Sequence, residues 1–376
     1  MVYSMNILFV SDAYNIGGGE RNLLEVAISI RKKGNNILIC IPSNGDFKLA
    51  LEANGLDVIC YNEKLFCHKN KFKLIMQSYK AAVYLKSVFE TKNYIPNVVH
   101  SNNGMTVLLA YFLKRLYHIP SFWTCHGPWE TVRGIKSWGI SHMMDGTFTI
   151  TPEIYIANTA KNKILIPLGI KMDVDTNNER KNREKKSKRK ILCAARFSKI
   201  KGQDILVRAF EKLYKNDKNV ELHFFGETLN QSREDCLFFS EIRKYVQSEN
   251  LCDVIFFHKF DPNIRSRMLD YDIVCIPSRY ESFSIVALEA MQLGLKVVAP
   301  NIGGPSYIIE NMKSGLLFNP ESVEDLADKL CSLIAGDVIL STKEIKSRAQ
   351  MFDVDEQARR MLNEYKKNSS DFSIST

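Results

Sequence analysis

Short apolar runs alternate along the chain with longer segments in which apolar residues recur at helical spacing. In the first half, runs at 6–10, 36–41 and 98–101 predict strands, and periodic segments at 23–30 and 106–116 predict helices. Strands that are apolar throughout and are separated by helices are typical of a parallel sheet covered on both faces. The first half therefore predicts a doubly wound α/β unit.

A polar, densely charged segment at 171–190 interrupts this alternation and predicts a linker. The alternation then restarts. Strands are predicted at 191–194, 221–225, 254–257, 273–276 and 296–298, and helices at 203–213 and 285–293. Because such sheets bind ligands at the carboxyl ends of their strands, we expect two facing α/β units with a ligand cleft between them.

The composition excludes several classes of protein. The 376 residues are 45% hydrophobic and 25% charged, which is ordinary globular usage and argues against collagen-like and disordered chains. No apolar run approaches the roughly 18 to 20 residues that span a bilayer, and the nine cysteines include no C-x-x-C pair. We therefore expect a reduced, cytoplasmic protein. Its net charge of +9 is concentrated in the first half and the linker.

Three consecutive glycines, Gly17 to Gly19, lie between the first predicted strand and the first predicted helix. Bare backbone at a helix N-terminus lets an anion approach closely, so Gly18 and Gly19 are candidate ligand contacts. The dinucleotide pattern G-x-G-x-x-G fails here because Asn22 occupies the place of its last glycine, which argues against a nicotinamide enzyme. A tight turn without a ligand is the alternative.

Two cations and two carboxylates follow strands of the second unit. Arg196 and Lys201 lie between its first strand and the next helix, where two positive charges suit a diphosphate; solvated surface charge is the alternative. Glu281 lies in a later loop, and Glu289 follows on the next helix among apolar neighbours. A carboxylate in such surroundings needs a partner, and ribose or sugar hydroxyls would serve.

Taken in order along the chain, these motifs resemble those of the family 4 retaining glycosyltransferases. The resemblance rests on the E-x7-E pair of Glu281 and Glu289 and on the R-x4-K-G motif that begins at Arg196. Further motifs that match are Gly-Gly-Gly-Glu-Arg at 17–21, Ile-Pro-Leu-Gly-Ile at 166–170, Gly303-Gly304 and Gly315-Leu316-Leu317. Together they cover nearly the whole chain.

The resemblance implies a GT-B fold, in which two Rossmann-like domains face a central cleft. Residues 1–170 would bind the acceptor and residues 191–353 the nucleotide sugar, with 171–190 as the charged linker. Residues 354–376 would form a helix that returns to the first domain, followed by a short polar tail.

The same resemblance gives each motif residue an expected role. Arg196 and Lys201 would hold the donor diphosphate, Glu281 the sugar hydroxyls and Glu289 the ribose hydroxyls. His126, in Thr-Cys-His-Gly, would reach the transferred sugar and completes the catalytic set. The other donor contacts would be Gly18, Gly19, Gly226, Lys259, Phe283, Ser284 and Ile285, with the nucleobase near Lys259 and phosphate at the amides of 283–285.

Three glycine positions of the family pattern, and the position of the proline common after Gly294, are occupied by other residues in this chain. Ser282 and Ser284 replace glycines that usually flank the phenylalanine between them, and His258 replaces the glycine before Lys259. Serine adopts fewer backbone conformations than glycine, so we expect the difference to lie in the shape of the loop that carries Glu281.

The resemblance implies the retaining transfer of a hexose or N-acetylhexosamine from a nucleotide-diphosphate sugar, with UDP as the expected nucleotide and no metal or other cofactor. The expected acceptor is a lipid-linked glycan in bacterial surface-polysaccharide synthesis; a nucleic-acid partner is not expected. Two alternatives stay open, a nucleotide-sugar 2-epimerase on the same fold and an inactive nucleotide-sugar-binding module.

A metal-dependent glycosyltransferase would use an Asp-x-Asp pair, and two such pairs occur, at Asp173 with Asp175 and at Asp353 with Asp355. The first opens the linker. Asp355 is predicted to cap the last helix, so neither pair requires a metal.

Basic side chains surround apolar positions in the first half. They are Lys69, Lys71, Lys73, Lys80, Lys86, Lys114, Arg115, Arg133 and Lys136. Together with Trp129 and Trp138 they suggest a peripheral contact with anionic lipid at the inner face of the cytoplasmic membrane. An ordinary solvated lysine face is the alternative.

Overall fold

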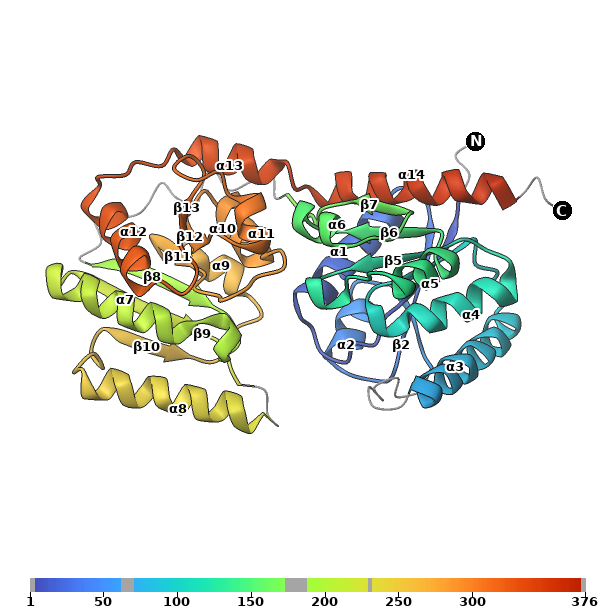
Figure 1. The fold of residues 1–376 in the computed structure, drawn as a ribbon, viewed down its shortest axis with the longest axis horizontal. Coiled ribbons are helices and arrows are strands. Elements are labelled where there is room, and N and C mark those ends of the chain that lie inside the picture. Colours follow the sequence, from blue (N-terminus) through green and yellow to red (C-terminus); the bar gives the residue numbers. More distant parts are fainter. Residues whose placement is uncertain (1–3, 62–70, 173–187, 229–231, 373–376) are drawn as a thin grey trace. The chain divides into compact units, whose positions relative to one another are not determined.

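The computed structural model describes residues 4–61, 71–172, 188–228 and 232–372 and consists of two compact units (Figure 1). The first unit comprises Met1–Lys171 and Phe352–Thr376, and the second comprises Met172–Met351. Each unit is a parallel sheet flanked by helices, so the prediction of two α/β units is confirmed.

The first unit has a seven-stranded sheet in the order β3-β2-β1-β4-β5-β6-β7. Its strands are β1 (Asn6–Val10), β2 (Asn36–Ile41), β3 (Asp57–Cys60), β4 (Val98–Ser101), β5 (Ser121–Cys125), β6 (Gly146–Thr149) and β7 (Lys163–Leu165). Its helices are α1 (Gly18–Lys32), α2 (Asp46–Ala53), α3 (Lys71–Thr91), α4 (Val107–Tyr117), α5 (Ile135–Met143), α6 (Pro152–Ala157) and α14 (Val354–Phe372). The strand order reverses between β1 and β4, which is where open α/β sheets bind ligands.

The second unit has a six-stranded sheet in the order β10-β9-β8-β11-β12-β13. Its strands are β8 (Arg189–Ala194), β9 (Val220–Phe225), β10 (Ile255–His258), β11 (Ile273–Cys275), β12 (Lys296–Pro300) and β13 (Leu316–Phe318). Its helices are α7 (Gln203–Asn216), α8 (Arg233–Ser248), α9 (Ile264–Met268), α10 (Ile285–Gln292), α11 (Gly303–Ile308), α12 (Val323–Ala335) and α13 (Thr342–Gln350). Its order reverses between β8 and β11.

Most predicted elements are shifted by a few residues at one or both ends, and two of these differences concern the glycine motif and the linker. Helix α1 already begins at Gly18, because the Glu20 carboxylate accepts the Gly17 N–H at 3.0 Å and closes the first turn; Gly18 and Gly19 are therefore helical and not part of a loop. Strand β8 begins at Arg189, inside the predicted linker, because its first residues pair with β9. The rest of that linker, residues 173–187 with the pair Asp173 and Asp175, lies outside the described residues.

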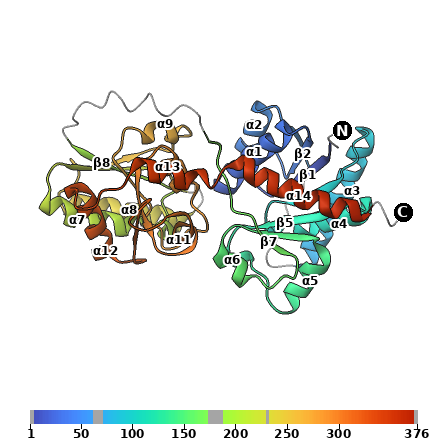
Figure 2. The same ribbon diagram turned by 90° about the horizontal axis from the view of Figure 1, so that it is seen from above.

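Helix α14, at the end of the chain, packs against α1 in the first unit (Figure 2). Its apolar side chains Val354, Ala358, Met361, Leu362 and Tyr365 are buried in the same core as β1, α1 and β2. The Tyr365 hydroxyl is hydrogen-bonded to His100 Nδ1 of β4 at 2.8 Å, which satisfies a phenol buried under the helix.

The start of α14 is held by polar contacts near Gly169. Gln357 accepts the Gly169 N–H at 2.7 Å and exchanges hydrogen bonds with Asn22 of α1. The prediction that Asp355 caps this helix is wrong. The helix begins at Val354, so Asp353 precedes it and accepts the Asp355 N–H at 2.9 Å, while the Asp355 carboxylate accepts a hydrogen bond from Ser29.

Candidate functional site

The loops that follow β8 and β11 are in close contact at the carboxyl edge of the second sheet. Gly202, which follows a single 3₁₀ turn (Lys199–Lys201), has a φ of 66°, and a Cβ at this position would overlap the Pro277 carbonyl oxygen. Only glycine fits both conditions without strain. The Arg279 N–H also donates to the Ile200 carbonyl at 2.8 Å. The glycine of the R-x4-K-G motif thus brings its lysine to the loop of Glu281.

Lys201 and Glu281 form an ion pair with Nζ and Oε2 separated by 2.7 Å. The Ser278 hydroxyl donates to the same carboxylate oxygen at 3.0 Å. The Lys201 side chain is 28% exposed and that of Glu281 17%, so both charges are partly desolvated and still accessible to a ligand. The structure therefore brings together two of the four predicted catalytic residues.

Arg196, the second predicted cation, is placed differently. Its side chain is 45% exposed, and its Nε lies 3.9 Å from the carboxylate of Asp235 on α8. The side-chain amide of Gln203 donates to the backbone carbonyl of Arg196 at 2.8 Å, which fixes the loop. Arg196 is thus on the same sheet edge as Lys201 but does not share its partners among the described residues.

The loop from Glu281 to Ser284 is supported by the pair Gly303 and Gly304. The Gly304 N–H donates to the Glu281 carbonyl at 2.8 Å. A Cβ on Gly303 would overlap that carbonyl, and one on Gly304 would overlap the backbone of Phe283. Close backbone packing therefore explains why this motif has two glycines. It also fixes the N-terminus of α10, which carries Glu289, a side chain only 3% exposed.

Ser284 has a φ of 79°, in the left-handed region that favours glycine. The family usually has glycine at this position. This chain has serine there, but its backbone still adopts the conformation that favours glycine. We expect Ser284→Gly to raise the free energy of unfolding by about 1 kcal/mol, because it removes a steric penalty of that size. Ser282 has no positive φ, so Ser282→Gly, measured alongside by thermal denaturation, should be neutral or destabilising. A lower melting temperature for Ser284→Gly would contradict the strain argument.

Gly226 and Lys259 follow β9 and β10 at the same sheet edge. The Gly226 N–H donates to the His258 carbonyl at 3.2 Å, and a Cβ on Gly226 would overlap the Ala195 carbonyl, next to Arg196. Lys259 is exposed. These two predicted donor contacts therefore lie at the carboxyl ends of β9, which pairs with β8, and of β10, which pairs with β9.

His126, the predicted contact for the transferred sugar, follows β5 in the first unit. Its ring lies against the first turn of α1, with Cε1 only 3.6 Å from where a Cβ of Gly19 would be. Burial lowers the pKa of His126 to about 4, so the ring is neutral at physiological pH. Nε2 is buried and has no hydrogen-bond partner within the described parts of the chain, which suits a group that meets a ligand hydroxyl.

Glu130, which was not predicted from the sequence, fixes His126. Its carboxylate accepts the N–H of His126 at 2.7 Å and that of Gly104, in the loop after β4, at 2.8 Å. Burial, together with the nearby charge of Asp12, raises the pKa of Glu130 to about 7. The spacing of four residues from His126 was the signal available in the sequence.

Arg279 was also missed. Its guanidinium forms two hydrogen bonds with the Asp204 carboxylate of α7, at 2.9 and 2.8 Å, and pairs with Glu321 at 3.1 Å. A bidentate pair of this kind fixes orientation as well as distance. Arg279 thereby holds the loop of Glu281 against the N-terminus of α7.

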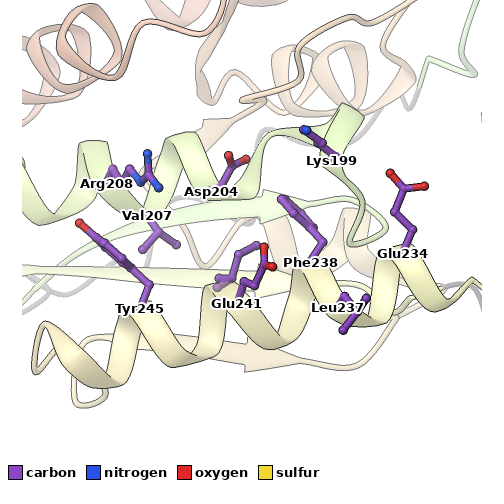
Figure 3. A pocket seen from close by; sticks show the side chains of 10 residues that line it. Lys199, Asp204, Val207, Arg208, Glu234, Leu237, Phe238, Glu241 and Tyr245 are labelled. Carbon is purple, nitrogen blue, oxygen red and sulfur yellow. The ribbon is translucent and has the colours of Figure 1, made fainter.

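A groove of about 400 Å³ lies between α7 and α8 (Figure 3). Apolar side chains such as Val207, Leu237 and Phe238 line it, and charged side chains such as Glu234 and Arg208 surround it. None of the predicted donor contacts lines this groove. The groove is therefore separate from the predicted donor contacts at the loop edge.

No group of three or more His, Cys, Asp or Glu side chains in the described ranges is arranged to hold a metal ion. The Asp353 and Asp355 pair serves the start of α14, as described above. Over the same ranges, no helix is both long and apolar enough to cross a bilayer.

Solved glycosyltransferase structures share this fold of two parallel α/β sheets. One is Anabaena HepE in complex with UDP and glucose, with a TM-score of 0.76, 20% identity and coverage of 96% of this chain and 98% of that one. Another is a glycosyltransferase from Rickettsia africae, with a TM-score of 0.78, 22% identity and coverage of 97% and 98%. The fold is GT-B, as predicted.

Two family models match the chain in succession, glycosyltransferase family 4 at residues 16–160 and glycosyl transferases group 1 at residues 174–351. The chain belongs to the family 4 glycosyltransferases.

Two curated relatives illustrate the range of this family. Poly(ribitol-phosphate) alpha-N-acetylglucosaminyltransferase from Staphylococcus aureus is 28% identical over 42% of this chain, and the match spans 31% of that protein. D-inositol 3-phosphate glycosyltransferase from Mycobacteroides abscessus is 22% identical over 95% of this chain and 86% of that protein. The match to the Staphylococcus aureus protein covers only about a third of that protein's length, and several other matches are as short.

Proposed function

We propose that this glycosyltransferase transfers a hexose or N-acetylhexosamine from a UDP-sugar to an acceptor hydroxyl with retention of configuration, releasing UDP. The observation that carries the proposal is the Lys201–Glu281 pair, with its 2.7 Å separation, beside the N-terminus of α10 and at the edge where the sheet order reverses. A cation, a carboxylate and a helix N-terminus together suit a diphosphate joined to a sugar. The neighbouring structure of HepE in complex with UDP and glucose supports this choice of donor.

The residues have distinct proposed roles. Lys201 and Arg196 stabilise the charge that develops on the diphosphate, aided by the amides of Phe283, Ser284 and Ile285. Glu281 binds the sugar hydroxyls near the reacting carbon, and Glu289 binds the ribose. The remaining donor contacts come from Gly18, Gly19, Gly226 and Lys259, and neutral His126 meets a hydroxyl of the transferred sugar.

In the proposed reaction, the acceptor oxygen forms its bond to the anomeric carbon on the face from which the nucleotide leaves. The bond between that carbon and the phosphate oxygen breaks, and the acceptor proton passes to the departing phosphate oxygen. The two cations and the helix amides take the part that a divalent metal has in other glycosyltransferases, so we propose that no metal is required.

The proposed acceptor is a lipid-linked glycan used in surface-polysaccharide synthesis, which the protein reaches through peripheral contact with an anionic membrane. The relative named as a poly(ribitol-phosphate) alpha-N-acetylglucosaminyltransferase supports a polymeric acceptor.

The test is incubation with a panel of UDP-sugars in excess EDTA, without acceptor. We expect slow hydrolysis of one donor to UDP and a free sugar, with the α-configuration of the donor retained in the first product. Isomerisation of the nucleotide sugar would indicate an epimerase, and binding without turnover would indicate an inactive module. Complete loss of activity in EDTA that manganese restores would reject the metal-free mechanism.

A further inference from the structure

Helix α3 of the first unit carries apolar side chains on two faces. Its inner face, with Ser78, Ala81, Ala82, Leu85 and Phe89, is buried against the unit. A second set points outward at a spacing of three and four residues, and we call it the α3 stripe. The α3 stripe consists of Phe72, Ile75, Met76, Tyr79 and Val83, which are between 44% and 71% exposed.

The α3 stripe extends onto the neighbouring helix. Figures 1 and 2 show α3 beside α4 on the outside of the first unit. The ring of Tyr79 packs edge-on against Phe112 of α4, with centroids 5.4 Å apart. Exposed apolar side chains in a continuous row are unusual on a soluble surface and indicate that something covers them.

The positive charge beside the α3 stripe favours one kind of partner. Lys73 and Lys80 are exposed and lie along one side of it, and the sequence from Lys71 to Phe89 contains no Asp or Glu. A second copy of the chain is a poor partner, because a twofold contact would bring the same lysines together. An apolar face bordered by lysines suits the boundary between anionic headgroups and acyl chains.

We propose that α3 lies in the interface of an anionic bilayer, with the α3 stripe inserted among the acyl chains and Lys73 and Lys80 at the headgroups. This goes beyond the basic patch inferred from the sequence, because it assigns the contact to one helix and adds an apolar insertion to the attraction of charge. It deepens the membrane contact in the proposed function and does not depend on the donor or on the reaction.

The test is flotation with vesicles of phosphatidylcholine, alone or mixed with phosphatidylglycerol. We expect binding to the mixed vesicles that weakens with salt. Phe72→Gln with Met76→Gln should weaken the partition coefficient about tenfold or more at any salt concentration, because apolar insertion is lost. Lys73→Glu with Lys80→Glu should weaken it by a similar factor, chiefly at low salt. All four side chains are exposed, so folding should be unaffected.

A matched control is Leu49→Gln with Lys161→Glu, which changes one exposed apolar and one exposed basic residue of the same unit and should bind as wild type. Equal binding by wild type and the α3 variants would overturn the proposal. Loss of binding by Trp138→Ala alone would also overturn it, because the contact would then be at α5. A dimer in solution that is abolished by the Phe72 and Met76 substitutions would overturn it as well. UDP-sugar hydrolysis without vesicles should be equal in all variants, so a failure of the proposed function would appear in that assay and not in flotation.

Discussion

Replacing Lys201 with alanine should lower kcat/KM for the nucleotide sugar by about 100-fold. A charge-assisted contact contributes about 1.5 to 3 kcal/mol, which corresponds to a factor of roughly 10 to 100. The structure places the expected loss at the upper end of this range, because the variant also leaves the partly buried Glu281 without its cation, 2.7 Å away in the wild type. A carboxylate in that state would repel the diphosphate. Steady-state kinetics with the donor varied would measure the loss.

The matched control is Lys199→Ala, which removes an exposed lysine from the same 3₁₀ turn. We expect it to retain activity close to wild type, because its ammonium does not pair with Glu281. The melting temperature of both variants should be within a few degrees of wild type. Equal losses in the two variants would mean that the general charge of the loop matters and not the position of Lys201, and the diphosphate role would have to be withdrawn.

The fold could be predicted from the sequence because its strands are buried on both faces. Runs such as 6–10 and 36–41 contain almost no polar residues, and the helices between them have a clear period. The errors lie at element ends, where local contacts decide. Glu20 extends α1 backwards over two glycines, and Asp353 takes the capping place predicted for Asp355. Neither contact follows from periodicity.

The candidate site could be predicted in its residue types but not in its contacts. Lys201 and Glu281 are 80 residues apart in the sequence, and Arg279 and Asp204 are 75 apart, so their pairing depends on which loops the sheet order makes neighbours. Glycines such as Gly202 appear in the sequence only as motif members. Glycine is required at these positions because a Cβ would overlap a backbone carbonyl of another loop. That contact can be seen only in the folded structure.

Glu281 and Glu289 should differ in which kinetic parameter they control, although both belong to the E-x7-E pair. Glu281 is partly exposed and bonded to Lys201 and Ser278 at the loop edge, where the sugar is proposed to react. We expect Glu281→Gln to lower kcat by about 100-fold, the scale of removing one preorganised polar group from a reacting centre. The donor KM should change little, since the amide still accepts hydrogen bonds.

Glu289 lies within α10, where its side chain is buried and is proposed to bind the ribose. A ribose contact is made equally in the ground state and the transition state, so Glu289→Gln should raise the donor KM about tenfold and leave kcat nearly unchanged. UMP is a suitable probe, because it contains the ribose but no transferred sugar: its inhibition constant should rise for Glu289→Gln and stay constant for Glu281→Gln. If Glu289→Gln lowered kcat alone, with UMP bound as in the wild type, the two carboxylates would have to exchange their proposed roles.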